Sequence, residues 1–457
     1  MLPSPTFAVA ELRKILGIAF YEERLLFTTL LLRRPDLRIV YLTSLPVDEA
    51  IVEYYLRFVP DPVHARRRLA MVALDDPSPV PLTEKLLTRP DLVDHVRRLA
   101  GPPEQAYLLP FNVTMAEEAL ADALDLPVFG PHPDLVPLGS KTGSRRVARR
   151  AGVPVLEGSE ALYSLDEVER AVADLRARRP EAEAVVVKLN DGFSGQGNAL
   201  IDLAGLTSPL PMSSTTFCAA KESWPSFAAK IAKGGAIVEE LVRREGTVSP
   251  SVQVRIAPDG SFDVVSTHDQ ILGGPSNHVY LGCRFPAAPA YRLDIQRAGV
   301  AVAEVLAGEG VIGSFGIDFL LVPGDGGPRL YLSEINLRMG GTTHPFWMTR
   351  LATGGRYDPR TGELVAGGRA KSYWATDNLK SEHLVGCTPA EVIEAVDRAG
   401  LAFDPATGTG IALHLLGALP QFGKMGATCI ADSPDDADAL AAELARVVVN
   451  GVVNRSG

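Results

Sequence analysis

Cysteine and long apolar runs are both scarce in this sequence, and each absence excludes a class of protein. The four cysteines stand far apart, at Cys218, Cys283, Cys387 and Cys429. Their spacing is that of neither a metal site nor a disulfide framework. The most apolar early segment, 25–32, is too short to cross a membrane, and Glu11 interrupts any signal-peptide core. We therefore expect a cytoplasmic protein with no membrane partner.

Positive charge is also in deficit. The net charge is −10 and the isoelectric point about 5.4, so we expect no nucleic-acid partner. Lysine is the rarer cation, with ten of the 45 basic residues. An arginine-rich composition is typical of a GC-rich genome. Each remaining lysine is therefore more informative, because arginine and lysine are not interchangeable at a phosphate site.

The first 130 residues lack the glycine fingerprint of a dinucleotide-binding domain. The sequence after the first expected strand reads SLPVDEA, without GxGxxG. Short apolar runs instead alternate with segments of helical spacing, which predicts parallel βαβ units. After a helical start up to residue 34, strands are expected at 38–44, 69–75, 106–111 and 126–130, with helices at 47–58, 86–99 and 114–124.

A glycine-rich loop follows a buried strand in the middle of the chain. The stretch reads VVVKLNDGFSGQGN, so the strand delivers Lys188 into a loop that contains Gly192, Gly195 and Gly197. This arrangement can hold phosphates. Lys141 begins a basic helix just after a proline-rich boundary at 131–137. A solvated basic face and an anion site both fit that lysine.

Two later strands carry polar residues on one face. Hairpins are expected at 251–266 and at 313–337, and the second contains Asp318, Glu334 and Asn336. An aspartate in an apolar strand is unfavourable unless it is paired or bound to a metal. Glu334 and Asn336 alternate with apolar residues and so share a face. Their oxygens suit Mg²⁺, although a polar outer face is the alternative. Loops expected at 208–216 and 273–282 are candidates to close over a site.

In this order, Lys141, Lys188, DGFSGQG, AIVEELV, IDFLL and SEINLRMGG resemble the ATP-grasp superfamily of carboxylate–amine ligases. The flanks are similar to the peptide ligases of the pheganomycin type, which have a pre-ATP-grasp domain. The resemblance implies an α/β fold with an α+β core. It implies a Rossmann-like pre-ATP-grasp domain at 1–130, an ATP-grasp core at 131–355 divided at 240, and a C-terminal α/β extension at 356–457.

The resemblance also implies roles for individual residues. Asp318, Glu334 and Asn336 would hold one or two Mg²⁺ ions. The residues implied to bind ATP are Lys141, Lys188, Gly192, Ser194, Gly195, Gly197, Glu239, Glu240, Leu241, Val242 and Glu245. The family often has an arginine just before the first metal carboxylate, but GSFGIDF has none. Its charge would come from the candidate catalytic residues Arg255, Arg284 or Arg338.

The implied activity is an ATP-dependent peptide ligase in the biosynthesis of a peptide natural product. It would join an amino-acid-like carboxylate to the amine of an amino acid or peptide through an acyl phosphate, with ATP and Mg²⁺. The alternatives are a phosphotransferase of the same fold and a non-catalytic nucleotide-binding protein. The expected partners are ATP, the acid and the amine, and a homodimer stays open.

Overall fold

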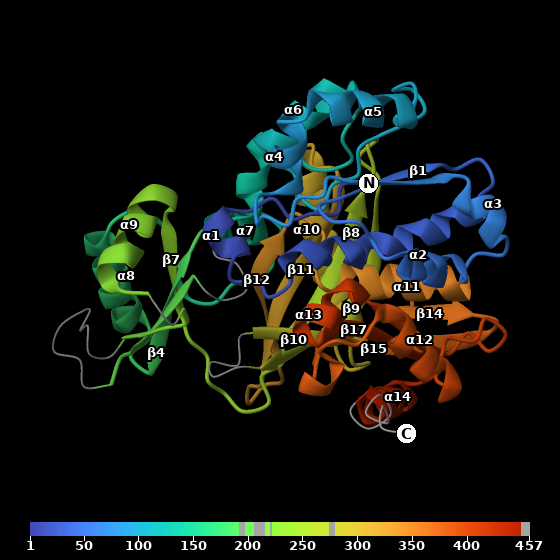
Figure 1. Cartoon of the computed structure of the whole chain (residues 1–457). Coiled ribbons are helices and arrows are strands. Elements are labelled where there is room, and N and C mark those ends of the chain that lie inside the picture. Colours follow the sequence, from blue (N-terminus) through green and yellow to red (C-terminus); the bar gives the residue numbers. More distant parts are fainter. Residues whose placement is uncertain (192–196, 205–214, 220–221, 274–278, 449–457) are drawn as a thin grey trace.

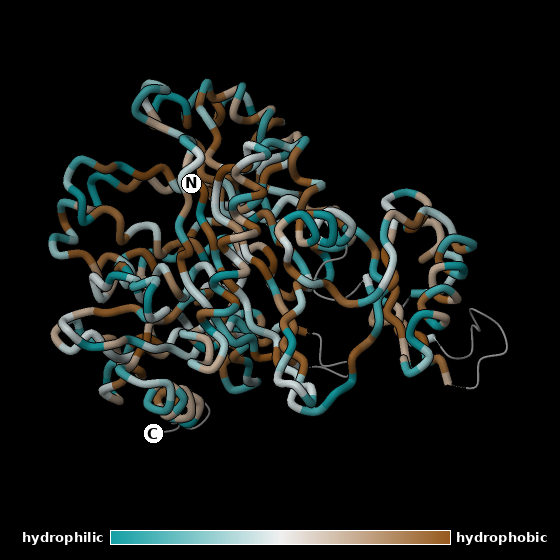
Figure 2. Tube along the Cα trace, turned by 180° about the vertical axis from the view of Figure 1, so that it is seen from behind, coloured by the Kyte–Doolittle hydropathy of each residue, from teal (hydrophilic) through white to brown (hydrophobic). Residues whose placement is uncertain are grey.

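The computed structural model describes residues 1–191, 197–204, 215–219, 222–273 and 279–448. A small lobe stands apart from a larger body that contains both termini (Figure 1). Much of the chain through the middle of the body is apolar, and hydrophilic segments are frequent on the outer helices and loops (Figure 2). Within the described residues, no helix has the length and apolar character needed to cross a membrane.

The N-terminal region contains a short parallel sheet, in which β1 (Ile39–Thr43) pairs with β2 (Leu69–Ala73). The strands expected at 106–111 and 126–130 are only isolated parallel bridges, Leu2 to Pro110 and Leu108 to Val128. Thr114 caps its helix through a capping box with Glu117. The helices are α1 (Val9–Leu12), the 3₁₀ helix η1 (Ile18–Arg33), α2 (Glu49–Leu56), α3 (Pro62–Arg66), α4 (Leu82–Leu87), α5 (Pro90–Ala100) and α6 (Met115–Leu124).

The small lobe is an antiparallel sheet with two helices on one face. Its strand order is β3 (Gly158–Leu162), β7 (Ala236–Glu240), β4 (Ala184–Leu189), β5 (Asn198–Asp202) and β6 (Thr215–Phe217). The helices are α8 (Leu165–Arg178) and α9 (Trp224–Gly234). Val185 and Val187 join the apolar core beneath these helices. Because side chains alternate along a strand, Val186 and Lys188 face the other way, toward the body.

A second, larger sheet forms the body. Its order is β12 (Arg329–Asn336), β11 (Gly313–Val322), β8 (Pro250–Ile256), β9 (Phe262–Gly273), β10 (Val279–Phe285), β15 (Arg369–Lys380), β14 (Glu363–Ala366) and β13 (Arg356–Asp358). Beside it, β17 (Lys424–Ala431) pairs with β15 and with β16 (Gly410–His414). Both predicted hairpins, β8–β9 and β11–β12, are confirmed.

The loop expected at 273–282 is wrong at both ends. Gly273 ends β9 and β10 begins at Val279, while residues 274–278 lie outside the described part. Gly282 lies within β10, where the absence of a side chain allows close packing against β15. A Cβ on Gly282 would lie 2.2 Å from the carbonyl oxygen of Ala375 on β15. The loop expected at 208–216 lies outside the described residues up to 214, and its last two residues belong to β6.

Helices pack on both ends of the large sheet. After η2 (Pro133–Gly139), α7 (Lys141–Arg150) and α10 (Arg292–Gly308) share a core with β8, β11 and β12. The remaining helices are α11 (Thr343–Thr353), η4 (Glu382–Leu384), α12 (Pro389–Arg398), η5 (Leu416–Ala418), α13 (Leu419–Phe422) and α14 (Pro434–Arg446).

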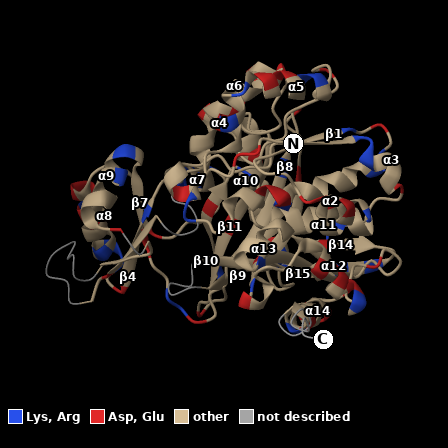
Figure 3. Cartoon of the chain, viewed as in Figure 1, with Lys and Arg blue, Asp and Glu red and all other residues tan. Residues whose placement is uncertain are grey.

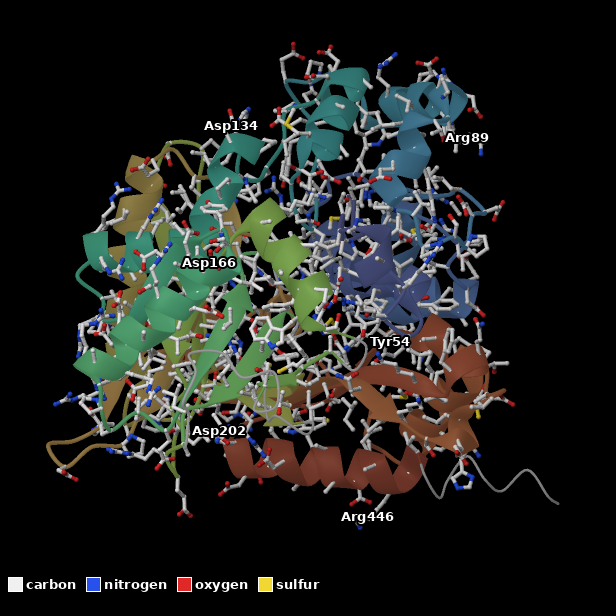
Figure 4. The ribbon with its side chains drawn as sticks, turned by 90° about the vertical axis from the view of Figure 1, so that its left-hand side faces the viewer. Tyr54, Arg89, Asp134, Asp166, Asp202 and Arg446 are labelled. Atoms are coloured by element: carbon white, nitrogen blue, oxygen red, sulfur yellow. The ribbon has the colours of Figure 1, made fainter. Side chains whose placement is uncertain are left out.

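The two ends of the chain pack against each other. One apolar core contains residues of η1 and α2 together with residues of α12, β16 and β17. The hydroxyl of Tyr54 on α2 accepts a hydrogen bond of 2.8 Å from the backbone N–H of Leu413. Figure 4 shows Tyr54 between the blue N-terminal helices and the orange C-terminal elements. Residues 356–448 thus add strands to the large sheet and pack against the N-terminal region.

Candidate active site

A cavity of about 1080 Å³ lies where the small lobe meets the body. Its wall takes residues from every part of the chain: Lys188 from the small lobe, Asp318 from the large sheet, Arg24 from η1 and Lys424 from β17. Basic and acidic residues are interspersed along the chain in Figure 3, and both occur near α7. The cavity therefore joins residues from both ends of the chain, from Pro5 to Lys424.

At the small-lobe end, Lys188 belongs to a buried ion-pair network. Its Nζ lies 2.7 Å from one carboxylate oxygen of Glu239, and Arg145 Nη1 lies 2.6 Å from the other. Burial alone would raise the pKa of Glu239, but the two cations outweigh it and lower that pKa below its ordinary value. Glu239 is therefore an internal counter-ion of Lys188, buried beneath the residues that line the cavity.

The residues after Glu239 do line the cavity. Glu240, Leu241 and Val242, three of the residues implied to bind ATP, lie along one wall. Apolar side chains share this part of the wall: Leu156, Val186, Leu200 and Leu320. An apolar slot at a strand end suits a planar base.

Lys141 begins α7 and is 7 % exposed. Ser140 caps the helix by accepting a hydrogen bond of 3.0 Å from the N–H of Gly143. Lys141 Nζ forms an ion pair with Glu334 on β12, and both residues line the cavity. The solvated basic face is thus wrong for Lys141, because the helix start is packed against β12.

The predicted metal ligands come together on β11 and β12. Asp318 and Glu334 are direct cross-strand neighbours. Asn336 donates a 2.9 Å hydrogen bond from Nδ2 to Asp318 Oδ2, and Gln270 donates one of 2.6 Å to Oδ1. Burial, and then the charge of Glu334, raise the pKa of Asp318 to about 7. Two neighbouring carboxylates with an amide oxygen fit a divalent cation, which would relieve their repulsion.

Of the three candidate catalytic arginines, the structure brings only Arg338 to the cavity wall. Its Nη2 donates a 2.9 Å hydrogen bond to Asn336 Oδ1. Arg284 is instead paired with Asp438 of α14, at 2.9 Å, and Arg255 lies over the ring of Phe129. Arg255 and Arg284 lie on strands of the large sheet and Arg338 lies just after the end of β12, so position along the sequence alone did not distinguish them.

The glycine-rich loop and Glu245 complete the set of residues implied to bind ATP. Gly192, Ser194 and Gly195 lie outside the described residues. Gly197 is described, and its carbonyl accepts a 2.9 Å hydrogen bond from the N–H of Leu189, where the strand leads into the loop. Glu245 is exposed in the loop after β7 and does not line the cavity.

Sequence reasoning missed the far end of the cavity. Tyr21 and Arg24 of η1, Asp377 and Lys380 of β15, and Lys424 of β17 line it together. These residues come from the two ends of the chain, so no local motif links them. The scarcity of lysine was the available signal, because Lys380 and Lys424 are two of only ten.

Asp377 is held firmly at this end. Its Oδ1 lies 2.9 Å from Nε2 of both His344 and His414, and its Oδ2 lies 3.4 Å from Arg24 Nη1. Burial acts to raise the pKa of Asp377, but the histidines and Arg24 hold it well below its ordinary value. Asp377 is thus a carboxylate whose charge these neighbours already stabilise.

Comparison with known proteins identifies the architecture. The family described as "IQCH-like, ATP-grasp" matches residues 136–215 and 210–358, and the "PGM1 C-terminal domain" matches residues 391–444. The chain is 35% identical over 418 residues to the L-propargylglycine–L-glutamate ligase of Streptantibioticus cattleyicolor, with 89% of this chain and 85% of that protein covered. It is also 22% identical to the IQ motif-containing protein H of Danio rerio, over 73% of this chain and 36% of that protein.

Solved structures agree on the fold at low identity. Biotin carboxylase from Campylobacter jejuni superposes with a TM-score of 0.58 at 13% identity, covering 95% of this chain and 94% of that one. N5-carboxyaminoimidazole ribonucleotide synthetase from Thermus thermophilus gives 0.53 at 15% identity, with 94% and 97% covered. Taken with the 35% identical ligase, these matches show that the chain belongs to the ATP-grasp superfamily of carboxylate–amine ligases, enzymes that use ATP to form a C–N bond.

Proposed function

We propose that this ligase joins the carboxylate of one amino-acid-like substrate to the amine of an amino acid or peptide. ATP is consumed through an acyl phosphate, and ADP and phosphate are released. The reaction would serve the biosynthesis of a peptide natural product. The ligase of Streptantibioticus cattleyicolor, whose name gives two amino acids as its substrates, supports this substrate class.

One observation carries the proposal: the cavity is continuous from Leu241 beside the base slot, past Asp318 and Arg338, to Lys424 at the far end. A phosphotransferase needs room for ATP and one acceptor at the γ-phosphate. This cavity extends well beyond the metal-site strands into a region built by η1 and β17. That region provides the space for a second and a third reactant.

The chemistry needs no enzyme nucleophile. An oxygen of the acid carboxylate attacks the γ-phosphorus, and the bond from that phosphorus to the β,γ-bridging oxygen breaks, so ADP leaves. The amine nitrogen then attacks the acyl carbon, the bond to the phosphate oxygen breaks, and the amine loses a proton. Lys141 and Lys188 would position the phosphates, and Arg338 would stabilise charge on the transferred group.

Asp318, Glu334 and Asn336 would hold Mg²⁺. When bound, the ion would offset negative charge on the phosphates and act as a Lewis acid. Lys141 and Gln270 contact these carboxylates, at Glu334 and Asp318 respectively. The chain's own residues thus keep the ligand side chains in place.

The same proposal gives each of the three regions, 1–130, 131–355 and 356–457, a role in binding. The core at 131–355 would bind ATP, with the small lobe over the phosphates. The region at 1–130 and the extension at 356–457 would together form the substrate end, through η1 and the strands β15 and β17. A homodimer and a cytoplasmic location stay predictions, and size-exclusion chromatography with light scattering measures the first.

A coupled ADP-release screen tests the function. Pairs of amino acids, and amino acids with short peptides, are offered with ATP and magnesium, and product masses are measured. We expect ADP, phosphate and a condensed product in equal amounts, only when acid and amine are both present. ADP release with a phosphorylated product and no free phosphate would establish a phosphotransferase instead.

A further inference from the structure

We propose that the far end of the cavity is a carboxylate-binding subsite in which Lys424 and Lys380 hold a substrate carboxylate that is not the one activated by ATP. This inference rests on the proposed function, because it names which feature of the amino-acid substrate the enzyme reads. It assigns a role to the region that η1, β15 and β17 build.

The first observation is that Lys424 lacks an anionic partner. Lys424 is 6 % exposed, and its Nζ donates a 2.8 Å hydrogen bond to the hydroxyl of Tyr21 and lies 4.9 Å from the centre of that ring. Within the described residues, no carboxylate lies within 4.0 Å of it. A buried ammonium is strongly unfavourable unless an anion accompanies it.

The other buried cations show that this is exceptional. Six basic side chains in the described part of the chain are buried, and five have a carboxylate within 4.0 Å. Those five are Arg24, Lys85, Lys141, Arg145 and Lys371. Among the buried lysines and arginines of the described residues, Lys424 beside Tyr21 is thus the exception.

The second observation is that another lysine stands directly opposite. Lys380 on β15 is the cross-strand partner of Lys424 on β17, and both line the cavity. Like charges at directly opposed positions destabilise a sheet. A bound anion between the two ammonium groups would offset that repulsion. It would also neutralise the buried charge of Lys424.

The neighbouring groups favour an anion rather than a cation. Asp377 is the carboxylate of this end, and His344, His414 and Arg24 already surround it. It therefore offers little to the ammonium of a substrate. With Arg24 offset by Asp377, the lysines leave an excess of positive charge. Two ammonium groups and a tyrosine hydroxyl suit a carboxylate, such as the free α-carboxylate of an amino acid or an acidic side chain.

The test compares Lys424→Met with wild type, since methionine keeps the shape of the chain and removes the charge. We expect the KM of one amino-acid substrate to rise by about 10- to 100-fold, the effect of one charge-assisted hydrogen bond, while the KM for ATP stays within about twofold. Lys424→Arg should recover part of the loss. Lys233→Met, at an exposed position of α9, is the matched control and should behave as wild type.

A binding measurement separates this inference from the ligase activity. The rise in Tm with millimolar L-glutamate is measured for wild type and Lys424→Met, and then with L-glutamine and L-isoglutamine, which each lack one carboxylate. We expect the shift to disappear in the variant and with the one analogue that lacks the recognised carboxylate. Equal shifts in both proteins, or shifts with all three amino acids, overturn the subsite whatever the ligation screen gives. Binding without any condensed product would keep the subsite and reject the proposed function.

Discussion

Two lysines at opposite ends of the cavity meet the problem of a buried charge differently. Lys188, at the nucleotide end, lies 2.7 Å from Glu239, which Arg145 also contacts. Lys424, at the far end, is more deeply buried and has a tyrosine hydroxyl as its hydrogen-bond partner. The charge of Lys188 is balanced by Glu239 in the ligand-free protein, so a bound phosphate would add a second anion beside the same lysine. The charge of Lys424 would be balanced only by the ligand itself. The two ends should therefore respond differently to loss of charge.

The largest effect is expected between the two ends, at the metal-site strands. Glu334→Gln should lower turnover by about 100-fold or more, because it removes a charged oxygen where phosphoryl transfer needs a cation. The fold should stay intact, since glutamine is nearly isosteric, with a lower unfolding temperature because Lys141 loses its ion pair. Glu304→Gln, at an exposed position of α10, is the control. Undiminished turnover at low millimolar magnesium would reject Glu334 as a ligand.

At the nucleotide end, Lys188→Ala should raise the KM for ATP and lower kcat. The expected loss in kcat/KM is about 10- to 100-fold, because a cation that holds phosphates acts in both the ground and the transition state. Steady-state kinetics with ATP as the varied substrate measures it. A variant that is merely less stable, with unaltered ATP kinetics, would make Lys188 a structural residue.

A third prediction compares two buried lysines by stability alone. Lys371 lies 2.5 Å from Asp432 and donates a hydrogen bond to the carbonyl of Thr407, so Lys371→Met should lower the free energy of unfolding by about 1–3 kcal/mol. Lys424→Met should lower it by less than about 0.5 kcal/mol or raise it, because no counter-ion is left behind. Thermal unfolding without ligand measures both. Equal destabilisation would mean that Lys424 has a structural role like that of Lys371.

The smallest expected effect is on the pH dependence of stability, through two buried glutamates of η1, Glu22 and Glu23. Burial raises the pKa of Glu22 to about 7 and that of Glu23 to about 8. A carboxyl with a raised pKa holds its proton in the folded state, so its stabilising contribution is present below pH 4.5 and is lost as pH rises toward 8. Glu23→Gln should therefore flatten the fall in stability between pH 5 and pH 8, by about 1 kcal/mol or more. Glu53→Gln, exposed on α2, should leave the slope as it is.

The sequence predicted the elements whose evidence is local. The β11–β12 hairpin could be recognised because its turn and its alternating residues are consecutive, and the same pattern placed Asp318 and Glu334 on one face. Lys188 was identifiable from the strand that precedes it and the loop that follows.

Features that depend on distant packing could not be predicted. Glu239 was expected among the ATP-binding residues, but its burial against Arg145 follows from how α7 lies on β7. Arg255, Arg284 and Arg338 could be ranked only once the sheet order was known. The far end brings η1 against β15 and β17, more than 350 residues away, and no local pattern encodes that contact.

The acyl phosphate itself is the central claim, and oxygen transfer tests it most directly. The acid that gives most turnover is labelled with ¹⁸O in its carboxylate, and the phosphate released during ligation is analysed by mass spectrometry. The account predicts that each phosphate carries one oxygen from the carboxylate, because that oxygen attacks the γ-phosphorus and leaves with it. Release of unlabelled phosphate during product formation would contradict it.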